Sequence, residues 1–271
     1  MAEISWAVRQ LFPMPVDFKI LLWILKLGAL VNVYFIVSLL ALETFDLYAV
    51  VPALILLGVS AFRCLFPNRY LDNVVFHDSP LSSIFLTRLL ATFSEVAYIY
   101  LFSYVIRVLN PEQNLWVNAL SWLMVVQVVV SQGLVWGAIL TKRLELYFYE
   151  ELGWFVIFAA NSLASLMLYF GTAPPSGGEG LLLLNLLFGV FYLPWQVLHL
   201  RSLLSEAQED QDPGSAPCHW SEGLRDALYQ RNRRTDARAW GGLIGLTWMV
   251  AYWVSLIPWW VHHIASVVST R

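Results

Sequence analysis

The chain has 271 residues, of which 59% are hydrophobic and only 13% are charged, and its formal net charge is −3. A water-soluble fold of this composition would be covered with apolar surface, so the composition excludes an ordinary soluble domain. The small net charge says little about partners, and because nothing in the sequence suggests nucleic acid, we expect none as a partner. The class that fits is an integral membrane protein surrounded by membrane lipids.

Seven stretches are apolar, and each has roughly the length that a helix needs to cross a hydrocarbon layer about 30 Å thick. They do not alternate with a period of two, so we expect their backbone hydrogen bonds within helices and not in a barrel. We predict an all-α, polytopic membrane protein, a single bundle over residues 1–271. Its transmembrane helices, about seven, are expected at about 20–41, 47–65, 82–107, 115–140, 146–170, 181–199 and 242–266.

Local signals indicate where some helices begin and bend. Ser79 followed by Pro80 is typical of an N-cap and a first helical position, and we expect this pair to start the third span. A proline inside a helix removes one backbone hydrogen bond and crowds the preceding turn. Kinks are accordingly expected at the three prolines that lie within spans, Pro52, Pro194 and Pro258.

Lysine and arginine are distributed unevenly between the loops, and cytoplasmic loops carry the excess of these residues. Of the 16, Lys26 and Arg88 lie inside spans, while Arg107 and Arg271 fall on one side. The other side carries the rest, so we expect a cytoplasmic N-terminus and an external C-terminus. The residues on that side are Arg9, Lys19, Arg63, Arg69, Lys142, Arg143, Arg201, Arg225, Arg231, Arg233, Arg234 and Arg238.

A polar cytoplasmic loop is expected at about 200–240, between the sixth and seventh spans. It begins with an acidic sequence, SEAQEDQD, and continues with a basic one, LRDALYQRNRRTDARAW. An arginine cluster beside a membrane attracts anionic head groups, at about 1 kcal/mol per residue. We interpret the loop as an anchor that orients the protein, with a regulatory or partner-binding segment as the alternative.

The third span carries a glutamate, Glu95, near its middle, and a carboxylate at that depth is the strongest functional signal in the chain. Successive residues turn by about 100°, so Arg88, Thr92 and Glu95 share one face within about 40°. Along the helix axis Arg88 and Glu95 are roughly 10 Å apart. Because this is long for an ideal direct contact, we expect them to interact through a water molecule or a third side chain.

Polar residues also line one face of three other spans. The fourth has Gln127 and Ser131 one turn apart, with Gln132 on a different face. On the fifth, Glu150 lies near the cytoplasmic end, where water could reach it, and shares a stripe with Trp154, Asn161 and Ser165. The seventh is expected to carry one continuous aromatic and polar stripe of Trp248, Tyr252, Ser255, Trp259 and then His262 or His263.

Two interpretations apply to these stripes. Amides and hydroxyls can simply join neighbouring helices, at about 0.6 kcal/mol per contact, and Arg88 can satisfy a carboxylate as part of the packing. A charge at the bilayer centre costs at least about 2.5–3.5 kcal/mol, however, and packing can be achieved with uncharged residues. For Glu95 we therefore favour a functional role over a purely structural one.

Our leading hypothesis is a membrane-embedded enzyme that acts on a lipophilic substrate, such as an isoprenoid, a sterol-like lipid or an acyl lipid. Glu95 would serve as the acid or base of catalysis, and Arg88 as its catalytic partner. The tryptophans and tyrosines of the fifth and seventh spans could form the walls of the cavity. The candidate substrate-binding residues are Glu150, Trp154, Asn161, Gln127, Tyr252 and Trp259.

Two other classes of function fit the same residues. One is a proton- or ion-coupled carrier of small molecules, in which Glu95 and Arg88 form a titrating pair along a pathway. The other is a noncatalytic scaffold or assembly factor whose polar faces join a partner helix or a second copy. We expect no metal or cofactor, because the five histidines lack HxxxH or HExxH spacing and the chain has no Walker, GxSxG or dinucleotide-binding pattern.

Overall fold

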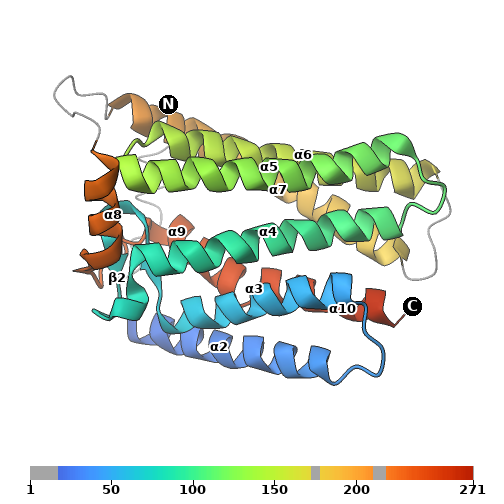
Figure 1. The fold of residues 1–271 in the computed structure, drawn as a ribbon, viewed down its shortest axis with the longest axis horizontal. Helices are drawn as coiled ribbons and strands as arrows, with labels where there is room; N and C mark the ends of the chain where they lie inside the picture. The colour runs from blue at the N-terminus through green and yellow to red at the C-terminus, as the bar shows by residue number, and fades with distance from the viewer. Residues whose placement is uncertain (1–17, 172–177, 210–217, 271) are drawn as a thin grey trace.

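A computed structural model describes residues 18–171, 178–209 and 218–270 (Figure 1). Within these ranges the chain forms an all-α bundle, which confirms the predicted fold class; the N-terminal residues 1–17 lie outside them. Six helices are long and apolar enough to cross a membrane, which is compatible with an integral multi-pass protein. They are α2 (Phe18–Leu40), α3 (Leu47–Leu65), α4 (Ile84–Val108), α5 (Leu115–Thr141), α6 (Glu145–Gly171) and α7 (Gly178–Glu209).

The last pass through the bundle consists of two helices, α9 (Gly242–Trp253) and α10 (Leu256–Ser269), which follow one another in Figure 1. The prediction of one continuous helix over 242–266 is therefore wrong. Pro258 lacks a backbone N–H, and its ring excludes a helical carbonyl four residues earlier. Ser255 accordingly leaves the helical region, with φ −127° and ψ −82°. The proline expected to bend this span interrupts it.

The backbone at this interruption is held by α2. A carbonyl left open at a helix end inside a membrane finds no water to bond. Asn32 is fully buried, and its Nδ2 donates to the carbonyl oxygens of Trp253 and Gly28, at 2.8 Å in each case. The approach is so close that a Cβ on Gly28 would lie 2.7 Å from a methyl group of Val254. The break is thus supported by a partner helix.

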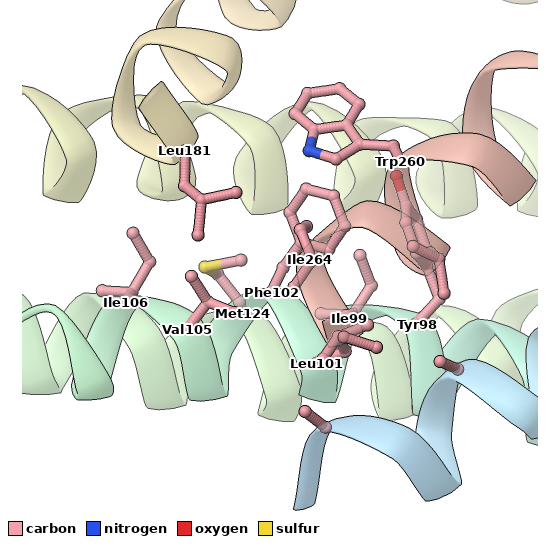
Figure 2. Packing of buried hydrophobic residues seen from close by; sticks show 14 of the residues in the cluster. Tyr98, Ile99, Leu101, Phe102, Val105, Ile106, Met124, Leu181, Trp260 and Ile264 are labelled. Carbon is pink, nitrogen blue, oxygen red and sulfur yellow. The ribbon is translucent and has the colours of Figure 1, made fainter. Parts of the chain in front are cut away.

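The main hydrophobic core lies along α4, where this helix meets α3, α5 and α10. Figure 2 shows Tyr98 and Phe102 of α4 beside Trp260 and Ile264 of α10. The ring centroids of Tyr98 and Phe102 are 4.8 Å apart, and those of Phe102 and Trp260 are 5.3 Å apart, both in edge-to-face arrangements that favour aromatic pairs. Helix α4 is therefore the central helix of the bundle, and its charged face has to be accommodated by its neighbours.

Segments of the loops form a cap at one end of the bundle, which we call the arginine-rich end (Figure 1). The cap contains a three-stranded sheet in which β1 pairs antiparallel with β2, and β2 pairs parallel with β3. This sheet joins the loop after α3 to the loop before α9. The cap elements are β1 (Asn68–Arg69), η1 (Leu71–Asn73), β2 (Val74–Val75), η2 (Pro80–Ser82), α8 (Trp220–Tyr229) and β3 (Asn232–Arg233).

The polar loop expected at 200–240 is partly folded, because α7 continues to Glu209 and α8 and β3 lie within the loop; residues 210–217 lie outside the described ranges. Helix α8 packs on the end of α5 so closely that a Cβ on Gly223 would clash with the carbonyl of Leu140. An ion pair between Lys142 and Asp226 stabilises this contact between α5 and α8. The hydrogen bond from the Lys142 amine to Asp226 raises the pKa of Lys142.

The start of α4 differs from the prediction by one short element. Ser79 does act as an N-cap, but its Oγ accepts a hydrogen bond from the Leu81 N–H at 3.3 Å and begins only the 3₁₀ turn η2. The chain is extended at Ser83, which then caps α4 by accepting from the Leu86 N–H at 3.3 Å. The Ser-Pro pair therefore does begin a helical turn, as predicted. That turn is the separate element η2, however, and not the first turn of α4.

The hydrogen bond from Asn32 to the α9–α10 break can be tested by replacement. We expect Asn32→Leu to lower the free energy of unfolding by about 1–3 kcal/mol, because the Trp253 carbonyl loses its polar partner in an apolar environment. Unfolding in detergent, titrated with dodecyl sulfate, measures the change. Val33→Leu, on the outer face of the same helix, is the control and should leave stability unchanged. Equal stability of the two variants would contradict the assigned role.

Candidate functional site

A cavity of about 380 Å³ lies inside the bundle between α4, α6, α7 and α9, and residues of the cap line its part nearest the arginine-rich end. This volume is in the range of binding sites for small molecules. Along α6 the lining runs from Tyr147 to Phe158, a rise of roughly 16 Å. The cavity therefore extends from the cap to about the middle of the bundle.

The lining changes from polar to apolar along this axis. At the cap it is formed by Arg63 of α3 and by Asn68, Arg69 and Tyr70 of the loop that follows. Charged groups of α4 and α6 come next. Aromatic and aliphatic side chains form the deep end, which is lined by Tyr98, Phe158, Phe188, Tyr192 and Ile257. A ligand that fits this cavity would have a polar head and an apolar body.

Arg88 and Glu95 form a direct ion pair, which corrects the expectation that water or a third group would bridge them. Nη1 of Arg88 donates to Oε1 of Glu95 at 3.2 Å, and Nη2 donates to Oε2 at 2.8 Å. Two turns of helix separate the residues, and the combined reach of the two side chains spans that distance. Both are buried, with 2% of Arg88 and 7% of Glu95 exposed.

Gln132 of α5 completes this group. Its Nε2 donates to Oε2 of Glu95 at 3.0 Å, while its Oε1 accepts a hydrogen bond from Arg88. A bidentate, charge-assisted pair with a third partner holds the carboxylate in one orientation. The neighbouring Thr92, on the same face of α4, accepts from Nε1 of Trp136 at 3.0 Å. The charged face of α4 is therefore partnered by α5.

Glu150 of α6 has a different environment. It was expected near solvent, yet only 8% of the residue is exposed, because it lies inside the bundle beside the cavity. Its Oε1 accepts a hydrogen bond from Nε1 of Trp154 at 3.1 Å. Among the described residues its Oε2 has no hydrogen-bond partner. Of the two buried carboxylates at the cavity, Glu150 is the one with an oxygen available to a ligand.

Glu151 lies beside the same cavity and is tied to α7. Nε2 of Gln196 donates to both its Oε2 and its backbone oxygen at 2.8 Å. Nε2 of His199 lies 3.8 Å from its Oε1, and the imidazole stacks on Trp195. Because about a quarter of its side chain is exposed, Glu151 is placed nearer to solvent than Glu150.

Several polar atoms of the cavity wall have no partner. Buried polar groups in native proteins are nearly always hydrogen-bonded, and an unsatisfied group is costly. Each such atom costs stability unless a small rearrangement of the wall or a water supplies a partner. Within the described ranges, the buried atoms of the lining without a hydrogen bond are Nε of Arg63, Oδ1 of Asn68, Nε of Arg88 and the hydroxyls of Tyr98 and Tyr252.

The structure brings five of the eight candidate site residues to this cavity: Arg88, Glu95, Glu150, Trp154 and Tyr252. They come from α4, α6 and α9, which lie far apart in the sequence. Their chemical roles stay predictions, but their common location makes one site the simplest arrangement for them.

The other three candidates lie elsewhere. Asn161 is at the contact of α6 with α7, where its Oδ1 accepts from Nδ2 of Asn185 at 3.4 Å. Gln127 lies at the α5–α6 contact beside Gly153. Trp259 is 45% exposed, because the break between α9 and α10 ends the predicted continuous stripe. These residues join helices or face outward.

Sequence reasoning missed several residues of the site, among them Gln132 and Arg63. Gln132 was placed on a different face from Gln127, which is correct, but only the packing of α5 against α4 shows that this face meets the ion pair. Arg63 lies in the last turn of α3 and was counted only as an orienting charge. In the described part of the chain, no group of three or more His, Cys, Asp or Glu side chains is arranged to hold a metal ion.

Replacing one member of the Arg88–Glu95 ion pair should lower the free energy of unfolding more than replacing both. Glu95→Leu leaves the Arg88 guanidinium buried without a counter-ion, and we expect a loss of about 3–5 kcal/mol in the free energy of unfolding. Arg88→Met combined with Glu95→Leu should recover most of this loss, because an apolar pair of similar volume replaces two desolvated charges. Unfolding titrations in detergent measure both variants.

The exposed pair Arg143–Glu145 supplies the control for this experiment. Glu145→Leu breaks that pair at the surface, where water replaces the lost partner, and should change stability by less than about 1 kcal/mol. If Glu95→Leu were no more destabilising than Glu145→Leu, the ion pair would not have the structural importance assigned to it.

The chain was also compared with known proteins. No family model matches it, no curated protein matches it, and no solved structure matches it. The contacts, burial and charges of the cavity are therefore the basis for the function proposed below.

Proposed function

We propose that this protein is a membrane-embedded enzyme that acts on a lipophilic substrate held in the cavity, with the carboxylate of Glu150 as the acid or base. The observation that supports this most strongly is the state of Glu150. It is buried at a ligand-sized cavity, held at one oxygen by Trp154, and has no hydrogen bond to the other oxygen among the described residues. A positioned carboxylate of this kind is what proton transfer to or from a bound substrate requires.

The geometry favours Glu150 over Glu95 for the proton transfer. Both oxygens of Glu95 accept hydrogen bonds from Arg88, and one also accepts from Gln132. Protonating Glu95 would break these contacts and leave Arg88 without its counter-ion. In the proposal Glu95 and Arg88 form a fixed charged wall that orients the substrate, and Glu150 exchanges the proton.

The lining supports a lipophilic substrate. Trp154 and Trp248 are within the lining, and Phe158, Phe188 and Ile257 form its deep end. Large aromatic and aliphatic surfaces of this kind bind isoprenoid, sterol-like or acyl groups through burial of apolar area.

A proton- or ion-coupled carrier is the main alternative, and the buried Arg88–Glu95 pair is the observation that favours it. A carrier would move a solute across proteoliposomes without converting it. A scaffold would do neither, and replacing Glu150 would change only its assembly. These outcomes separate the three classes of function.

Turnover by Glu150→Gln tests the proposal directly. The wild-type protein, in phosphatidylcholine nanodiscs, is incubated with the lipid extract of its expression host, and products are followed by liquid chromatography and mass spectrometry. We expect one lipid class to be converted, and Glu150→Gln to reduce the rate by about 100-fold or more, because the amide cannot exchange the proton.

Glu179→Gln is the matched control, because Glu179 is an exposed glutamate in the first turn of α7, away from the cavity. It should convert lipid at the wild-type rate. An unchanged rate in Glu150→Gln, or a wild-type protein that converts no lipid, would refute the enzyme proposal.

A further inference from the structure

Arg63 is a buried arginine whose contacts in the described structure are all uncharged. It is 8% exposed, lines the polar end of the cavity and belongs to the last turn of α3. Its Nη1 donates to the hydroxyl of Tyr70 at 2.9 Å, and its guanidinium carbon lies 4.3 Å from the centroid of a Trp253 ring. It makes no ion pair with a carboxylate of the described residues, and its Nε has no hydrogen-bond partner there.

Arg88, the other buried arginine of the cavity, shows what such a group ordinarily needs. Its charge is balanced by both oxygens of Glu95 on the same helix. Buried charges in proteins are paired because an isolated one is costly to remove from water. Contacts with an aromatic ring and a hydroxyl orient Arg63 and offset only part of that cost. Its charge therefore remains available to an anion that enters the cavity.

We propose that the cavity binds a single-chain amphiphile with an anionic oxygen head group, whose head pairs with Arg63 and whose chain lies in the deep aromatic end. Arginine presents a planar set of donors that matches a phosphate or carboxylate. Asn68 and Tyr70 line the same polar part beside Arg63. The volume of about 380 Å³ suits one chain better than two.

The polarity of the bundle agrees with this placement. Arg63 is at the arginine-rich end, where lipid head groups would lie, and the apolar lining begins deeper in the bundle. A head at Arg63 places the body of the amphiphile past Glu150 and toward Phe158 and Phe188. The inference deepens the proposed function, and rests on it in making this ligand the substrate class.

Three probes with one chain isolate the head group: dodecyl phosphate, dodecanoate and dodecanol. Protein in phosphatidylcholine nanodiscs is equilibrated with each probe, and the retained probe is measured by native mass spectrometry of the released protein. We expect both anionic probes to bind at least tenfold more tightly than dodecanol. Arg63→Gln should lose that tenfold, which corresponds to about 1.4 kcal/mol, and bind dodecanol as the wild type does.

Arg107→Gln is the matched control. Arg107 also stacks on a tryptophan, with its guanidinium carbon 4.3 Å from the centroid of a Trp122 ring, and it also bonds to hydroxyls, but it lies in the last turn of α4 outside the cavity. It should bind all three probes as the wild type does. Arg63→Lys keeps the positive charge and should retain part of the preference for the anionic probes over dodecanol. That result would show that Arg63→Gln loses the preference through the missing charge and not through misfolding.

Dodecanol binding to the wild type as tightly as dodecyl phosphate would overturn the inference, even if Arg63→Gln failed to fold. So would an unchanged preference in a folded Arg63→Gln. The test also separates this inference from the enzyme proposal. If the anionic probes bind through Arg63 while Glu150→Gln leaves lipid conversion unaffected, the head-group site stands and the catalytic role of Glu150 falls.

Discussion

The constraint on which this structure depends is the need to balance charge inside an apolar bundle. Helix α4 is the most central helix and carries both an arginine and a glutamate on its inner face. Their bidentate contact, completed by Gln132 of α5, removes the cost of two separate charges and fixes the contact between these helices. The cavity lies against the resulting wall, so the same pair shapes both the core and the candidate site.

The interrupted last pass is the second determinant of the site. Because the helix ends at Trp253 and begins again at Leu256, α9 presents Trp248 and Tyr252 to the cavity, while Trp259 of α10 faces outward. Asn32 of α2 donates a hydrogen bond to the Trp253 carbonyl oxygen, which the break leaves without a helical partner. An interior irregularity in a membrane helix is tolerated where protein groups satisfy it, and here the residues beside it, Trp253 and Ile257, line the candidate cavity.

The sequence predicted the fold class, most helix boundaries within a few residues and the shared face of Arg88 and Glu95, since hydropathy and helical periodicity are local properties. It could not predict Gln132 or Arg63 as site residues, because their roles depend on which helices are neighbours. It also missed the cap, whose two-residue strands carry no periodic signal. The prediction of one continuous aromatic stripe was wrong for a local reason, because Pro258 interrupts the helix that would carry it.

The location of both charges of the α4 pair on a single helix has a consequence for biosynthesis. When a membrane protein is made, each segment enters the bilayer before later segments exist. An arginine whose counter-ion came from a later helix would have to enter hydrocarbon alone. Here the counter-ion lies two turns further along the same helix, so the charge of Arg88 is balanced within α4 itself and does not depend on a later helix; α5 then adds Gln132 to the pair.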